Sequence, residues 1–291
     1  MRALGRSVLA VLLIIATRAA AQPSVPTRGP SVSGLGSATS GHGPAAALVL
    51  TTAKPPFNVA AYAAVAFDAD TVAQADGTEV LTWTNVGSGG ATLNATGTTG
   101  QVPKYYNNVV NSHGVARFTG TTCQVATTTD IPMTDRASLL AVVSFANTTQ
   151  NYPIIAEAGA TAGNTEWRMN STAMRPQYLF RDSTGIVSPT ALNANEWHLI
   201  EGTYNQTAGY VFVDGVQMIT QTNPPIDPGT PRTLTIGHRG PYQLVGDIAY
   251  VVVVTTDLVD ADRQSLEGFL AWRFGLQGNL PAGHPYKSSP P

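Results

Sequence analysis

The acidic residues are the first groups that could do chemistry, because a retaining glycosidase holds two carboxyl groups about 5–5.5 Å apart. Alternate residues of a strand face the same side, so the spacing Glu-x-Asp-x-x-Glu, or a shorter variant, would supply such a pair. Asp68 and Asp70 share a strand face, but the needed third carboxylate does not follow them. The glutamates do not complete the pattern either: Glu79, Glu157, Glu166, Glu196, Glu201 and Glu267. The sequence therefore predicts no catalytic residues.

Other motifs of catalysis and metal binding are missing from the sequence as well. The five histidines are scattered, without His-x-His or His-Glu-x-x-His spacing: His42, His113, His198, His238 and His284. The chain has no Gly-x-Ser-x-Gly elbow and no Gly-x-x-x-x-Gly-Lys phosphate loop. A single cysteine, Cys123, excludes a disulfide framework and multi-cysteine metal sites, and its setting predicts a small buried hydrophobic residue.

The charge balance excludes nucleic acid as a partner. The chain carries 16 basic and 18 acidic residues and has a sequence pI near 6.2, so it offers no positive field for phosphate. Charged residues make up only 12% of the chain, which also excludes coiled coils and charge-driven disorder.

Sugar binding calls for an exposed aromatic face with planar polar side chains beside it. One segment pair supplies both groups through Trp167, Arg168, Tyr178 and Arg181. A second loop, from His238 to Tyr242, is also aromatic and basic. In the alternative interpretation, Trp167 packs inward and the arginines only keep an outer face of the sheet hydrated.

The amino-terminal residues resemble an export signal followed by a linker. Arg2 and Arg6 precede an apolar run that is too short to span a bilayer, and small residues follow at 19–21, so residues 1–21 are predicted to be a signal peptide. The alternative is an uncleaved anchor or an arm buried in an assembly. Residues 22–56 are rich in Pro, Gly, Ser and Ala and are predicted to be a flexible linker.

From residue 57 to residue 287 the sequence predicts one β-rich domain. Short runs of β-branched and aromatic residues alternate with turn residues, and no repeat of 20–50 residues is found. The predicted strands are 64–68, 81–84, 115–119, 138–145, 152–157, 166–170, 177–181, 197–204, 210–213, 216–220, 233–236 and 247–254.

Three local patterns are the sharpest structural signals. Asp214-Gly215 between alternating apolar runs predicts a two-residue hairpin turn. The run 250–254 is apolar throughout and predicts a central strand that is buried on both faces. Asp260 as N-cap and Gly275 as C-cap bracket one amphipathic helix. We expect Trp83, Trp197 and Trp272 to lie in the core, and His198 to be a strand or edge residue.

In this order the segments resemble the laminin-G-like branch of the concanavalin A-like lectin/glucanase superfamily. The resemblance covers nearly the whole domain and rests on these segments: Ala66-Phe-Asp-Ala-Asp70, Val80-Leu-Thr-Trp83-Thr-Asn85, Gly114-Val-Ala-Arg-Phe118-Thr-Gly120, Trp197-His198-Leu-Ile-Glu-Gly-Thr-Tyr204, Asp214-Gly215, Leu234-Thr-Ile-Gly237, Gly246-Asp247-Ile-Ala-Tyr-Val, Leu266 to Leu276, and His284-Pro285-Tyr286. It implies an all-β fold, a two-sheet antiparallel jelly-roll sandwich with one short C-terminal helix. It also implies that a calcium ion could bind at a loop rim, with Asp76, Asp227 and Asp247 as contributors.

Four Asn-x-Thr sequons, at Asn94, Asn147, Asn170 and Asn205, are glycosylation sites if the chain passes through a eukaryotic secretory route. Chance is the alternative, because a threonine-rich chain generates such triplets often.

These observations favour a non-enzymatic secreted or surface-displayed recognition or adhesion module that binds glycans or glycosylated partners, with no cofactor except calcium. One alternative is a structural surface, spike or decoration protein of a virus, phage or extracellular assembly, bound to its other subunits. A glycan hydrolase with an unrecognised carboxylate pair is the less favoured alternative.

Overall fold

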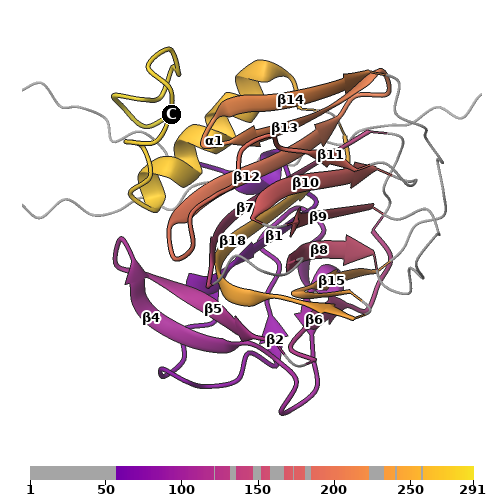
Figure 1. Cartoon of the computed structure of the whole chain (residues 1–291). Coiled ribbons are helices and arrows are strands. Elements are labelled where there is room, and N and C mark those ends of the chain that lie inside the picture. Colours follow the sequence, from indigo (N-terminus) through magenta and orange to yellow (C-terminus); the bar gives the residue numbers. More distant parts are fainter. Residues whose placement is uncertain are drawn as a thin grey trace, which may run out of the picture. The chain divides into compact units, whose positions relative to one another are not determined.

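The chain folds as a sandwich of two antiparallel sheets (Figure 1). The computed structural model describes residues 57–120, 122–131, 136–146, 152–157, 167–172, 174–180, 185–222, 233–239, 241–256 and 258–291. The predicted leader (1–21) and linker (22–56) lie outside the described residues, and the domain limits 57 and 287 stay predictions. The all-β sandwich with one C-terminal helix is confirmed.

Within the described residues each sheet has eight strands. Sheet A runs in the order β14 (Val216–Thr222), β13 (Ala208–Val213), β12 (Trp197–Tyr204), β7 (Ala137–Phe145), β18 (Val245–Val254), β5 (His113–Thr119) and β4 (Lys104–Val110), and β1 (Val65–Asp68) pairs with β18. Sheet B runs in the order β11 (Ile186–Val187), β10 (Arg175–Phe180), β9 (Trp167–Thr172), β8 (Tyr152–Glu157), β15 (Leu234–Ile236), β6 (Val125–Thr127), β3 (Ala95–Thr96) and β2 (Thr82–Trp83). A separate small hairpin joins β16 (His238–Arg239) to β17 (Tyr242–Gln243).

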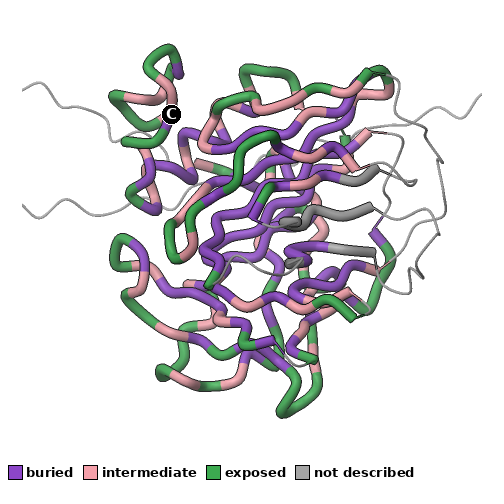
Figure 2. The backbone as a smooth tube through the Cα atoms, in the orientation of Figure 1, coloured by how far each residue is buried: buried purple, intermediate pink, exposed green. Residues whose placement is uncertain are grey.

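Strand β18 is buried on both faces, as its unbroken apolar sequence predicts. Val251 and Val253 point into the space between the sheets, where the larger core cluster lies. Tyr250, Val252 and Val254 point to the opposite face of sheet A and belong to a second cluster. Figure 2 shows the central strands buried along most of their length. Sheet A therefore needs a cover on its outer face.

Helix α1 (Asp260–Arg273) and the segment that follows it form that cover. Leu266, Leu270 and Phe274 pack in the outer cluster together with Val59, which lies in the short 3-10 helix η1 (Val59–Ala61). Gly275 has φ +73° and ends the helix, as predicted. The predicted N-cap was wrong by one residue, because the helix begins at Asp260 itself and Val259 precedes it without a side-chain cap.

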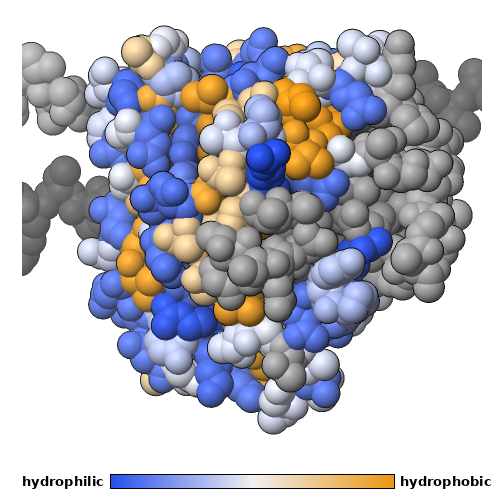
Figure 3. Space-filling view, in the orientation of Figure 1, coloured by the Kyte–Doolittle hydropathy of each residue, from blue (hydrophilic) through white to orange (hydrophobic). Residues whose placement is uncertain are grey.

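The α1 helix has 14 residues, and none of the helices in the described part of the chain has the length and apolarity to cross a membrane. Hydrophilic side chains and small hydrophobic patches are interspersed over the face seen in Figure 3.

The Asp214-Gly215 hairpin is confirmed between β13 and β14. Both residues have positive φ, +51° and +76°, as a type I′ turn requires.

Cys123 is buried, as predicted. Trp83 lies in the core and donates its indole N–H to the Asp68 carbonyl at 3.0 Å. Trp197 and Trp272 are only half-buried at the edge of the outer cover, so the core prediction holds for one tryptophan of three.

The outer cover encloses a group of charged side chains. Glu201 of β12 is 1% exposed and lies beneath α1, with Glu267 and Arg263 of the helix. Glu267 accepts from Arg263 Nη1 at 2.7 Å and lies 3.0 Å from His284 Nε2. By contrast, neither carboxyl oxygen of Glu201 has a hydrogen-bond partner among the described residues. Burial, and then the neighbouring Glu267 carboxylate, raise the pKa of Glu201 well above its usual value, although the Arg263 charge opposes this.

A raised pKa at Glu201 makes the stability of the fold depend on pH. The folded chain holds this proton more tightly than the unfolded chain does, so the free energy of unfolding falls as pH rises above the ordinary glutamate pKa toward the raised one. We predict that Glu201→Gln weakens this decline and stabilises the protein at pH 8 more than at pH 5, as measured by urea denaturation. Glu196→Gln, at an exposed glutamate, is the matched control. Parallel pH profiles for the Glu201→Gln variant and the original chain would contradict the assignment.

Candidate functional site

The first predicted sugar-binding surface is described at one of its four residues, Tyr178. Tyr178 is fully buried: its ring packs over Gly202, where an added Cβ would lie 2.3 Å from Tyr178 Cδ2, and its hydroxyl donates to the Ala137 carbonyl at 3.3 Å. The prediction that Tyr178 binds a ligand is therefore corrected. Trp167 and Arg168 lie in β9, but their side chains, like all of Arg181, fall outside the described residues.

The second predicted surface is the β16–β17 hairpin. His238 is half-buried, and Tyr242, opposite Arg239, is 39% exposed. An exposed aromatic ring beside basic residues is present there, so glycan binding by His238 and Tyr242 stays a prediction.

Two of the residues expected for calcium already have other partners. Both carboxylate oxygens of Asp247 accept from the Arg117 guanidinium at 2.8 Å, so this carboxylate is satisfied without a metal. Asp76 accepts from the Asn107 backbone N–H at 2.8 Å. Asp227 lies outside the described residues, within which no group of three or more metal-ligating side chains is found. The calcium prediction gains no support from Asp247.

The structure describes the side chains of two of the four predicted glycosylation sites, Asn94 and Asn205. Asn94 is half-buried and its side-chain oxygen accepts from the Asn85 N–H at 2.8 Å. Asn205 lies in the turn between β12 and β13, where its side-chain oxygen accepts from Thr207 and Ala208. Nothing is described of Asn147 or of the side chain of Asn170. Glycosylation stays a prediction at all four.

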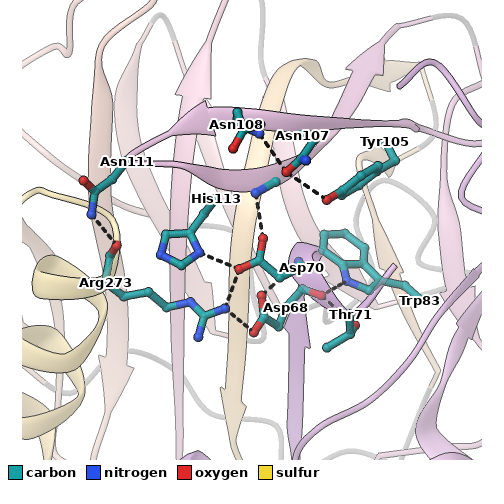
Figure 4. Close-up of polar contacts among 11 residues, drawn as sticks. Asp68, Asp70, Thr71, Trp83, Tyr105, Asn107, Asn108, Asn111, His113 and Arg273 are labelled. Atoms are coloured by element: carbon teal, nitrogen blue, oxygen red, sulfur yellow. Dashed lines mark hydrogen bonds and ion pairs between the residues drawn. The ribbon is translucent and has the colours of Figure 1, made fainter. Parts of the chain in front are cut away.

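Asp68 and Asp70, the carboxylates considered for hydrolysis, are held together by one arginine (Figure 4). Arg273 Nη2 lies 2.7 Å from Asp68 Oδ2 and 2.7 Å from Asp70 Oδ2. His113 Nδ1 also contacts Asp70 Oδ2, and the Gly114 N–H donates to Asp70 Oδ1 at 2.7 Å. We call these four side chains, Asp68, Asp70, His113 and Arg273, the Arg273 cluster.

The surroundings of the two carboxyl groups move their pKa values in opposite directions. Burial raises the pKa of Asp68, and the Arg273 charge only partly offsets it. Burial also acts on Asp70, but hydrogen bonds from Gly114 and His113, together with the charges of His113 and Arg273, outweigh it and lower the pKa of Asp70. Because Arg273 bridges both groups, the cluster ties the end of β1 and the 3-10 helix η2 (Ala69–Thr71) to the end of α1. This is a structural role.

An open groove of about 590 Å³ lies at the start of β12. It is lined by Glu196, Trp197, His198, Asp214, Leu276 and Asn279, and we call it the Trp197 groove. Its residues come from three places: β12 and the residue before it, the turn between β13 and β14, and the segment after α1. The strand pairing and the outer cover together create it.

Asp214 fixes the geometry of the groove. Its backbone N–H donates to the Leu199 carbonyl at 2.8 Å, and its Oδ1 accepts from the Leu199 N–H at 2.9 Å. Its Oδ2 lies 2.8 Å from His198 Nδ1. Since a carboxylate only accepts, we assign the proton of this contact to Nδ1, which leaves Nε2 of a neutral imidazole as an acceptor.

His198 Nε2 has no hydrogen-bond partner among the described residues, although it is buried. It lies 3.8 Å from Glu196 Oε2, which accepts from Asn193 Nδ2 at 3.0 Å. The Glu196 side chain is 56% exposed, and Asn279, another lining residue, is exposed as well. Trp197 packs partly against the outer core. The groove thus brings an aromatic ring beside planar polar groups.

Another groove, of about 440 Å³, lies between β12–β14 and the start of α1. We call it the α1 groove, and its lining residues are Thr203, Asn205, Tyr210, Phe212, Gln217, Leu258, Val259, Asp260 and Arg263. The Arg263 guanidinium carbon lies 4.1 Å from the centre of the Phe212 ring, so one face of that ring is already covered.

The sequence contains a signal for the Trp197 groove that the spacing of its carboxylates and histidines does not reveal. Trp197-His198 and Asp214 belong to the motif on which the family resemblance rests, and they were assigned to core, edge and turn. Leu276 and Asn279 carry no signal, because only the folding of the chain after α1 brings them beside β12.

Comparisons with known proteins agree with this architecture. A family profile described as the concanavalin A-like lectin/glucanases superfamily matches residues 117–262. None of the curated proteins matches the chain in sequence.

Among solved structures, the receptor binding domain of botulinum neurotoxin D superposes with a TM-score of 0.52 at 11% identity, over 75% of this chain and 54% of that one. The Trypanosoma rangeli sialidase, in complex with the inhibitor DANA, has a TM-score of 0.50 at 13% identity, over 72% of this chain and 33% of that one. This chain thus spans about half of the toxin domain and a third of the sialidase. At such identities the likeness shows the fold.

The Arg273 cluster yields a prediction about stability. Arg273→Ala leaves the largely buried Asp68 carboxyl without its cation, and we expect the free energy of unfolding to fall by about 2 kcal/mol, as for other lost hydrogen bonds to charged groups. Urea denaturation at neutral pH measures this change. Arg175→Ala, at an exposed position of β10, is the matched control and should have little effect. Equal stability of the two variants would show that Arg273 does not hold the cluster together.

Proposed function

Because the chain belongs to the concanavalin A-like lectin/glucanase superfamily, we propose that it is a non-enzymatic recognition module, secreted or displayed on a surface, which binds glycans or glycosylated partners through the Trp197 groove. The observation that carries this proposal is the half-buried indole of Trp197 in an open groove, beside the exposed Glu196 and Asn279 and the unpartnered His198 Nε2.

The composition of the groove suits a sugar. Sugar rings present C–H faces that pack on an aromatic side chain, and hydroxyl groups that exchange hydrogen bonds with planar polar side chains. Trp197 supplies the ring, and its indole N–H has no partner among the described residues. Glu196 and Asn279 supply a carboxylate and an amide at the rim. An open, shallow groove also admits an internal or terminal unit of a longer glycan.

The carboxylates of the groove support binding without hydrolysis. Both oxygens of Asp214 are occupied, one by the Leu199 N–H and the other by His198. Glu196 is then the carboxylate of this groove that can approach a ligand, whereas glycoside hydrolysis by the usual mechanisms needs two. Asp68 and Asp70 both pair with Arg273, and Glu201 and Glu267 are buried.

We predict that the full chain binds glycans on an array and that Trp197→Ala weakens binding at least about tenfold, because a central aromatic contact dominates such sites. Since Trp197 also packs on the outer core, Asn279→Ala provides a second variant at an exposed position, with a smaller expected loss. Tyr210→Ala, in the α1 groove, is the matched control and should keep full affinity.

Thermal melting of each variant separates lost folding from lost binding. An array that stays silent with and without calcium would overturn the proposal. Loss of binding in Tyr210→Ala but not in Trp197→Ala or Asn279→Ala would place the site in the α1 groove instead.

A further inference from the structure

The charges in the Trp197 groove have one sign. Among the described residues, its lining contains two acidic side chains, Glu196 and Asp214, and no arginine or lysine. The cationic side chains nearest along the chain to Asn279 are Arg273 and Lys287, and neither is among the lining groups. Arg273 binds Asp68 and Asp70, and the Lys287 ammonium group contacts the carbonyl oxygens of Gly278 and Leu280. A ligand in the groove therefore meets a negative potential, which favours cations and disfavours anions.

The hydrogen-bonding groups of the groove also favour a ligand that donates hydrogen bonds. With its Nδ1 proton donated to Asp214, the His198 ring offers an acceptor at Nε2, and Glu196 Oε2 is an acceptor 3.8 Å away. Two acceptors at this separation have no hydrogen bond between them, and the buried Nε2 has no other partner in the described part of the chain. A buried unsatisfied group calls for a partner. The missing partner is a donor.

An ammonium group has both the positive charge that the groove favours and the hydrogen-bond donors that its acceptors lack. It carries three N–H donors and no acceptor, so it can donate to the exposed Glu196 carboxylate. Its charge is also attracted to the face of an aromatic ring, and indole is the strongest such partner. Trp197 provides that ring in the same groove. A sugar carboxylate, by contrast, would face Glu196 without any cation lining the groove.

From these observations we propose that the Trp197 groove prefers glycans with a free amino group over their N-acetylated counterparts and rejects glycans with a carboxylate. The inference rests on the proposed function and names the ligand class of the same site. Glu196 is the residue that sets the preference, because it is the exposed carboxylate of the groove.

The test compares three probes against the full chain by titration calorimetry: a chitosan tetrasaccharide, the fully N-acetylated tetrasaccharide, and sialyllactose. We expect the amino form to bind about tenfold more tightly than the N-acetylated form at low salt, with a smaller ratio at high salt. Sialyllactose should not bind. Glu196→Gln should lower the ratio to about twofold or less, because the amide keeps the shape and loses the charge.

Asp260→Asn is the matched control. It removes one carboxylate charge at an exposed position in the α1 groove and should leave the ratio unchanged. This comparison separates a local effect of Glu196 from a change in net charge.

Each failure has its own meaning. Equal affinity for the amino and N-acetylated probes, or tight binding of sialyllactose, would overturn the preference and leave glycan binding in place. Unchanged selectivity in Glu196→Gln would overturn the assignment of Glu196. Silence with all three probes and on the wider array would instead remove the proposed function itself.

Discussion

The apolarity of strand β18 on both faces is the constraint on which the rest of the structure depends. Each residue from 248 to 254 belongs to the inner or the outer cluster, with strict alternation from Tyr250 to Val254, so sheet A cannot leave its outer side in water. Burying such side chains stabilises the fold by about 25 cal/mol per Å² of apolar surface. Sheet B covers the inner face. On the outer face, the start of the domain and α1 with its following segment provide the second cover.

That cover brings polar side chains along with the apolar ones, and the two groups of buried charges differ in how they are satisfied. In the Arg273 cluster, the arginine pairs with both Asp68 and Asp70. Deeper under the helix, Arg263 and His284 both bind Glu267, and Glu201 is left with no hydrogen-bond partner in the described region. A buried ion without partners is costly, so burial raises the pKa of Glu201. Arg273 therefore anchors the outer cover at the end of α1. Beneath the middle of the helix, the stability of the cover depends on the protonation of Glu201.

Sequence patterns predicted the elements whose local signal and tertiary environment agree. Asp214-Gly215 formed its turn, and the strands at 152–157 and 197–204 begin and end where expected. Strand β4 was missed because its sequence, KYYNNVV, lacks alternation, and the register shifts between Tyr106 and Val110, where Asn108 has positive φ. Tyr178 was misplaced because its burial depends on Gly202, a residue far along the chain that lies beneath the ring. The Trp197 groove also depends on contacts between segments that are distant in the sequence. Its residues can be found in the sequence, but their arrangement around one groove cannot be predicted from it.

The groove also illustrates why fold and ligand are separate questions in this superfamily. The sandwich superposes on the toxin binding domain and the sialidase at identities of 11% and 13%, which preserve the strand arrangement but few side chains. In the proposed site, the side chains lie near the ends of the strands, and hydrogen bonds within the fold determine their positions. Asp214 is required by the hairpin turn and by the Leu199 N–H, and it orients His198 as a consequence. The orientation of His198 thus follows from the same residue that makes the turn, so in the proposed site the structural motif and the hydrogen-bonding groups depend on a single side chain.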